Sequence, residues 1–358
     1  MIILRKHYID NLRGITVILV IFYHVCYIFN GVGVPGGIPN AQSLPIFDAA
    51  AAAVYPWFMV LLFVIAGMCA KYSLEKRTSR QFLGERARKL LVPSTLGLFF
   101  VHWVTGFLNI KAGGALEQIP PALIYPISVL SGIGPLWFVQ MLFLFSCLLV
   151  LIKRADKNER LLNLCSHFNA PLLILLAVPI CLSAQILNMP VVTTYRFGIY
   201  LVSFLIGYFV FSHEHVQNVL VKIRFFTLCA VIILGILYML RFAGQNFTLP
   251  ECLESIITNA YLWTFVLFAV GFSKKRLDFE NTFTQYIRKS SFGLYVLHYP
   301  IALSVCLLLN GVSALSVILK YILAFIAVPP LTAAANEIIG RIPIIRFCVL
   351  GKKSGVKK

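Results

Sequence analysis

Residues 8–30 read YIDNLRGITVILVIFYHVCYIFN, a long apolar run after a short polar start. A run of about 20 apolar residues crosses the hydrocarbon core of a bilayer, about 30 Å thick, as one helix. Comparable runs recur along the chain. They predict an all-α polytopic membrane helical bundle with about ten transmembrane helices, at residues 12–29, 51–70, 90–109, 135–152, 171–187, 196–211, 225–241, 255–272, 291–309 and 314–334.

The composition supports this fold class. Of the 358 residues, 59% are hydrophobic and only 12% are charged, and this charged fraction is about half of that in an ordinary soluble domain. A single soluble core could not enclose so much apolar surface, so membrane lipid has to cover it. The net charge of +18 does not indicate a nucleic-acid partner, because the basic residues lie between the apolar runs, where they set topology. We expect one membrane domain over residues 1–358.

The distribution of Lys and Arg orients the helices. With the N-terminus inside, 27 of them fall on predicted cytoplasmic segments and 3 on predicted outer segments, namely Lys111, Arg196 and Arg241. A missed or invented span would destroy this alternation, so it predicts ten spans with both termini cytoplasmic. The stretch 115–134 contains three prolines, and we predict a loop or an interfacial segment there.

The first span carries the candidate chemistry. Arg13 lies at its cytoplasmic end, and His24 lies eleven residues further along, on the same helix face and about 16 Å away along the axis. Asp10 shares this face. A histidine in the outward half of a membrane is costly unless it faces a bundle interior or a cavity. His24 either bonds a neighbouring helix or serves as a general base, and we favour the base.

Other polar residues are weaker candidates. Asp48 is the only acidic residue of the outer segment 30–50; it could orient His24, bind substrate, or remain a solvated loop carboxylate. His102 in the third span is expected to be structural or to line a substrate cavity. The basic segment 71–91 ends in a predicted interfacial helix, from which Arg86 and Lys89 project on one side. These cations either contact anionic lipid or bind a polyphosphorylated ligand, since guanidinium groups bind phosphate bidentately.

With these features, the chain resembles membrane acyltransferase family 3, a family of ten-span enzymes, over nearly its whole length. The most specific element is D-x-x-R-G followed by a histidine, present as Asp10, Arg13, Gly14 and His24. Two departures are Ala66 in FVIAGM, where the family commonly has serine, and Lys89, where a second arginine is common.

Three further elements resemble the family's motifs. They are the basic cluster before a proline, the stretch PLWFVQ in the fourth span, and SSFGLYVLHYPI near the ninth span. The residues that they place are Arg86, Arg88, Lys89, Trp137, Ser291, Tyr295 and His298.

The resemblance implies transfer of an acyl group, acetyl or succinyl, from cytoplasmic acyl-coenzyme A to a hydroxyl of a cell-surface or lipid-linked carbohydrate. The proposed acceptor contacts would then be Asp10 and His102, and the proposed donor contacts Arg13, Arg86, Arg88, Lys89, Trp137, Tyr295 and His298. His24, with Asp48 as a candidate helper, would deprotonate the acceptor or carry the acyl group itself.

The same resemblance implies a bacterial plasma membrane and a reaction without a metal ion. The alternative function is a secondary transporter or flippase of a glycan or small molecule. Transporters usually show internal repeats and paired broken helices, which the sequence does not show. Acyl chain, acceptor and oligomeric state are left open.

Overall fold

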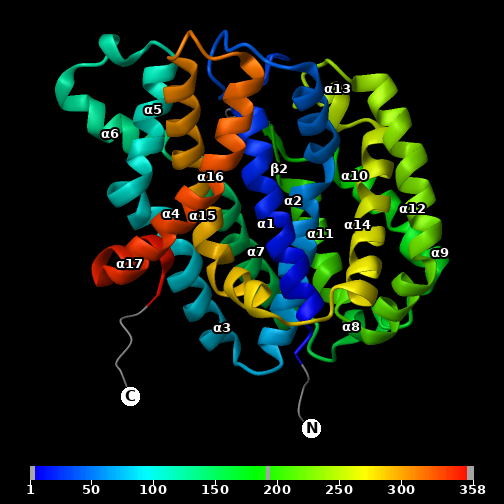
Figure 1. The fold of residues 1–358 in the computed structure, drawn as a ribbon. Coiled ribbons are helices and arrows are strands. Elements are labelled where there is room, and N and C mark those ends of the chain that lie inside the picture. The colour runs from blue at the N-terminus through cyan, green and yellow to red at the C-terminus, as the bar shows by residue number, and fades with distance from the viewer. Residues whose placement is uncertain (1–4, 191–193, 353–358) are drawn as a thin grey trace. The chain divides into compact units, whose positions relative to one another are not determined.

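The computed structural model describes residues 5–190 and 194–352 (Figure 1). This part of the chain is mostly helical with almost no sheet, and eight of its helical segments are long and apolar enough to cross a membrane. The protein is therefore a helical membrane protein, as its sequence predicts. The chain forms two compact units. Unit 1 takes the residues up to Thr16, Ala49–Ser79 and Phe145–Arg288, and unit 2 takes Val17–Asp48, Arg80–Leu144 and the chain from Lys289.

The long segments are α1 (His7–Ile28), α2 (Pro45–Leu74), Ser79–Ala112, α7 (Leu136–Ala155), α12 (Glu214–Phe242), α14 (Ile256–Arg276), α15 (Thr282–Asn310) and α16 (Val317–Arg341). Segment Ser79–Ala112 joins α3 (Ser79–Arg86), α4 (Val92–Gly97) and α5 (Trp103–Ala112) through two π-helical turns, η1 (Ala87–Leu91) and η2 (Leu98–His102). The shorter helices are η3 (Leu116–Gln118), α6 (Pro121–Ser131), α8 (Arg160–Cys165), α9 (Ala170–Leu175), α10 (Ala177–Ser183), α11 (Phe197–Ile206), the π-helical η4 (Gly207–Phe211), α13 (Pro250–Leu253) and α17 (Pro343–Leu350).

Two predicted segments take a different form in the structure. The stretch 115–134, predicted to be a loop or an interfacial segment, contains helix α6 (Pro121–Ser131), so the loop alternative is wrong there and the interfacial one stays a prediction. Pro121 stands at the first helical position, where the missing N–H of proline would have had no helical partner. The span expected at 171–187 consists of two short helices, α9 and α10, that meet at Leu176.

In unit 1, α12 and α14 pack along their lengths (Figure 1). The rings of Tyr238 and Tyr261 stack with centroids 5.5 Å apart. Their hydroxyls donate to the carbonyls of Ala52 and Ala53 in α2, at 3.1 and 3.0 Å. These bonds satisfy two polar groups that lipid could not satisfy, and they tie both helices to the small-residue stretch of α2.

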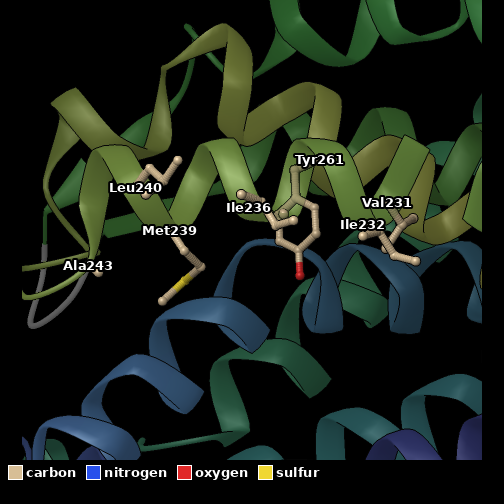
Figure 2. Close-up of a pocket in the computed structure, with 8 residues that line it drawn as sticks. Val231, Ile232, Ile236, Met239, Leu240, Ala243 and Tyr261 are labelled. Carbon is tan, nitrogen blue, oxygen red and sulfur yellow. The ribbon is translucent and has the colours of Figure 1, made fainter. Parts of the chain in front are cut away.

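The outer side of this helix pair carries an apolar groove of ≈ 600 Å³ (Figure 2). It lies along α12 from Val231 to Ala243, and Tyr261 of α14 closes its base with the hydroxyl turned toward α2. Large apolar side chains on α12 are exposed, among them Phe225, Ile233 and Leu240. A membrane helix with such a face presents it to lipid.

Two glycines let α2 cross α11 and η4 at close range. A Cβ on Gly67 would lie 2.0 Å from the carbonyl oxygen of Phe204, and a Cβ on Gly207 would lie 2.1 Å from that of Val64. Such contacts exclude any side chain, so only glycine permits this crossing. Small residues bring membrane helices together in this way. Gly67 belongs to the FVIAGM element, whose glycine therefore has a packing role.

The all-α prediction needs one correction, a short pair of antiparallel strands in unit 1. Strands β1 (Asn188–Pro190) and β2 (Thr194–Arg196) pair Asn188 with Arg196. Arg196 is buried, and its Nη2 donates to the carbonyl of Leu253 and to Oδ1 of Asn259, at 2.7 and 2.8 Å. The strands run for only three residues each, so alternation of side chains could not reveal them.

In unit 2, glycines again set the helix contacts. A Cβ on Gly293 of α15 would lie 1.8 Å from Oδ1 of Asn336 in α16. A Cβ on Gly106 of α5 would lie 1.9 Å from the carbonyl oxygen of Ser128 in α6. Helix α17 packs against α4. These contacts fix the frame that carries the candidate site.

Candidate active site

His24 and His298 form a pair in unit 2, although 274 residues separate them. His24 lies on α1 and His298 on α15. Nδ1 of His24 is 3.1 Å from Nε2 of His298, and the ring centroids are 4.7 Å apart. Nδ1 of His24 also lies 2.8 Å from the carbonyl oxygen of Val20, one turn earlier on α1. These contacts hold the two rings next to each other.

The two histidines differ in accessibility. His298 has 0% exposure, and its Nδ1 lies 2.5 Å from the carbonyl oxygen of Tyr295. Tyr295 is buried as well and donates its hydroxyl to the carbonyl of Pro135, at 2.9 Å. His24 is only half-buried. Of the two residues, His24 is therefore the more accessible one.

Tyrosines surround the ring of His24. Tyr27 and Tyr299 meet it edge-on, with centroids at 5.7 and 5.2 Å. Their hydroxyls donate to carbonyls of the loop after α1, those of Pro35 and Gly36. The sequence analysis did not single out either tyrosine. Their positions could have indicated a contact with the histidines, because Tyr27 follows His24 at helical spacing and Tyr299 is next to His298.

Asp48 takes part in a different arrangement. Its carboxylate is buried at the start of α2 and accepts hydrogen bonds from the backbone N–H of Gly31, at 3.2 Å, and from the hydroxyl of Ser43, at 2.9 Å. Both donors lie on the loop that joins α1 to α2. In the described part of the chain, its recorded hydrogen bonds go to this loop and not to His24. The geometry supports a structural clamp.

His102 closes the π-helical turn η2 and has 0% exposure. Within residues 5–190 and 194–352, neither of its ring nitrogens has a hydrogen-bond partner, and neither has Oγ1 of Thr105, one turn later. Buried polar atoms of this kind are rare and call for an explanation. Trp137 lies at the start of α7, next to Phe138, whose ring faces that of Tyr295 at 5.2 Å.

The basic candidates of unit 2 lie around η1. The guanidinium of Arg86 stacks over the ring of Phe82, at 5.0 Å. Lys89 forms an ion pair with Glu85, at 2.5 Å. Nε of Arg88 is buried and has no hydrogen-bond partner among the described residues. Because η1 is a π-helical turn, a feature frequent at functional sites, it supports the interpretation of this segment as a ligand site.

Arg13 and Asp10 belong to unit 1. Nη2 of Arg13 lies 2.9 Å from Oδ1 of Asp10, and Arg5 lies 2.8 Å from the other carboxylate oxygen. Asp10 thus holds two arginines near the start of α1. This contact gives Asp10 a direct role in orienting Arg13, beside the substrate contact that the resemblance implies.

The fold and the histidine pair define a membrane protein with a candidate acid–base site inside its helices. A family model described as "Acyltransferase domain" matches residues 6–335. The chain therefore belongs to membrane acyltransferase family 3, which confirms the resemblance of its motifs. This membership favours an enzyme over a transporter. Comparisons with curated proteins and with solved structures found no match.

Proposed function

We propose that the protein is an O-acyltransferase whose catalytic base is His24. The observation that carries this proposal is the state of the His24 ring. Its Nδ1 is engaged by the carbonyl of Val20 and by His298, while the residue as a whole is half-buried instead of fully enclosed. A held but reachable imidazole on a membrane helix suits proton transfer at a substrate. Membership of an acyltransferase family supplies the reaction type.

The proposed step moves an acyl group from a thioester to an alcohol. His24 takes the proton of the acceptor hydroxyl as its oxygen forms a bond to the thioester carbonyl carbon. The carbon–sulfur bond then breaks, and His24 returns the proton to the leaving thiolate. The products are an ester and a free thiol, and His24 returns to its original protonation state. In a second route, His24 carries the acyl group transiently before the acceptor attacks.

For the donor, we propose acetyl- or succinyl-coenzyme A. Its phosphates need cations, and Arg86, Arg88 and Lys89 around η1 are candidates in unit 2, with Arg13 in unit 1. The buried, unpartnered Nε of Arg88 supports a ligand here. Lys89 offers a charge without the planar fork of arginine. Trp137 and Tyr295 remain proposed donor contacts.

For the acceptor, we propose a hydroxyl of a cell-surface or lipid-linked carbohydrate. The unpartnered ring nitrogens of His102 support a contact with a polar ligand. We further propose ten spans, cytoplasmic termini and a bacterial plasma membrane. The excess of Lys and Arg on alternate segments supports this orientation.

The test measures donor binding and transfer on the same purified variants. The donor probes are acetyl- and succinyl-coenzyme A, and the acceptor probe is a mixture of glucan oligosaccharides analysed by mass spectrometry. His24→Gln should bind the donor normally but transfer ~10²–10⁴-fold more slowly, the usual contribution of a positioned base. The matched control is His215→Gln, at an exposed histidine. Normal transfer by His24→Gln would refute the proposal.

The second arm concerns the donor phosphates. Arg86→Ala should weaken donor binding about 10- to 100-fold, since a hydrogen bond to a charged group is worth about 1.5–3 kcal/mol. Arg80→Ala, at an exposed arginine of α3, is the control. If Arg86→Ala and Arg13→Ala both bind the donor with unchanged affinity, neither arginine contacts the phosphates of coenzyme A.

A further inference from the structure

The contacts of the histidine pair determine where its protons lie. A carbonyl oxygen only accepts hydrogen bonds. Nδ1 of His298, 2.5 Å from the carbonyl oxygen of Tyr295, therefore carries a hydrogen. Nδ1 of His24, 2.8 Å from the carbonyl oxygen of Val20, carries one for the same reason.

These two assignments fix the bond between the rings. The single Nδ1–H of His24 is shared between the carbonyl oxygen of Val20, at 2.8 Å, and Nε2 of His298, at 3.1 Å. If Nε2 of His298 also carried a hydrogen, two donors would point at each other in a buried place. His298 is therefore neutral with a bare Nε2, which accepts from His24. In the neutral His24 ring, the remaining nitrogen, Nε2, is then bare as well.

We infer that His298 is a positioning residue that holds His24 in the tautomer with Nε2 free to take a proton. This inference rests on the proposed function of His24. It applies to both routes, because the bare Nε2 is the atom that would deprotonate the acceptor and the atom that would carry an acyl group.

The same bond acts again after the proton has moved. Once Nε2 of His24 is protonated, the ring is a cation, and its Nδ1–H is still shared between the carbonyl oxygen of Val20 and the bare Nε2 of His298. A hydrogen bond from a charged donor is about twice as strong as a neutral one, so His298 stabilises the charged state that forms during transfer. His298 itself stays out of reach, at 0% exposure and with both nitrogens in contact with the protein.

This role differs from the donor contact implied by the family resemblance. A donor-binding His298 would need a nitrogen turned to a ligand, whereas its nitrogens face Tyr295 and His24. The buried ring orients the reachable ring. Nothing in this arrangement requires His298 to exchange a proton.

Two substitutions distinguish positioning from proton transfer. In His298→Gln, the amide oxygen replaces Nε2 as an acceptor, so transfer should stay within about tenfold of the original rate. His298→Leu removes the acceptor, and transfer should fall about 10- to 100-fold at unchanged donor affinity. Glutamine should thus be tolerated at 298 and not at 24. If folded His298→Gln is as inactive as His24→Gln, His298 exchanges protons and the inference is wrong.

A spectroscopic measurement tests the tautomer without a variant at 298. Nitrogen NMR of the full chain, labelled at histidine, distinguishes protonated from bare ring nitrogens, and His24→Gln identifies the signals of residue 24. We expect a protonated Nδ1 and a bare Nε2 for neutral His24. The opposite tautomer would overturn the inference while leaving His24 as a base. Full activity of His24→Gln would instead refute the proposed function. If His298→Leu fails to fold, the tautomer of His24 in this spectrum tests the inference by itself.

Discussion

At the residue scale, side chains of the same type have different roles that depend on their contacts. His24, His102 and His298 are all histidines in membrane helices. His24 is half-buried, and its recorded contacts involve only Nδ1. His298 is buried, and both of its ring nitrogens contact neighbouring residues. His102 is buried and has no hydrogen-bond partner in the described chain. Because a buried polar atom needs a partner, His102 is the best remaining candidate for a ligand contact.

Asp48 provides a prediction at this scale. If its carboxylate is a clamp for the loop after α1, Asp48→Ala should lower the free energy of unfolding by about 1–3 kcal/mol, because it leaves the N–H of Gly31 unsatisfied. Asp48→Asn keeps an oxygen for that N–H and should retain most stability and transfer. Ser43→Ala, which removes one of the bonds, is the graded control.

Thermal unfolding in detergent and the transfer assay together check this prediction. A folded, stable Asp48→Asn protein without transfer activity would contradict the clamp. It would show instead that the negative charge of Asp48 takes part in the reaction.

At the element scale, glycines decide how the helices cross. The crossing of α2 with α11 and η4 depends on Gly67 and Gly207, each of which leaves no room for a Cβ. The contact atoms are backbone oxygens, which side-chain rotation cannot move aside. The helix axes would have to separate to admit a methyl group.

Gly67→Ala should therefore destabilise the protein by at least the 1–3 kcal/mol or so typical of an overpacked interior. Gly84→Ala is the matched control, because a Cβ at Gly84 in α3 would meet nothing within 4 Å. It should be neutral or slightly stabilising, since alanine restricts the unfolded chain. Equal unfolding temperatures for the two variants would show that α2 and α11 do not cross closely.

At the scale of the whole molecule, topology follows from charge. The proposed orientation puts residues 31–47 outside and residues 71–89 in the cytoplasm. Single cysteines introduced there, in a background without reactive cysteines, should respond differently to an impermeant thiol reagent in intact cells. Labelling should reach 31–47 and miss 71–89, and permeabilised cells supply the control. Labelling of 71–89 in intact cells would reverse or break the proposed topology.

The sequence by itself determined the class of fold and the family. Long apolar runs force helices in a bilayer, because backbone groups in lipid must bond within their own segment. The spacing of Asp10, Arg13 and His24, with the later YVLHYP stretch, marked the family that the match over residues 6–335 confirms. These signals are local in the sequence, so they can be recognised without the tertiary structure.

Only the tertiary structure decided which side chains meet. The pairing of His24 with His298 spans 274 residues, and the engagement of Asp48 by its loop depends on how that loop turns. The paired strands 188–190 and 194–196 are too short for a periodic signal. Each depends on how distant segments approach one another in the folded chain, as they do where Gly293 of α15 meets Asn336 of α16. The sequence pointed to His24, and the contacts of the folded chain are the basis for the tautomer that we infer for it, because neighbouring carbonyls and a second ring set which ring nitrogen carries the hydrogen.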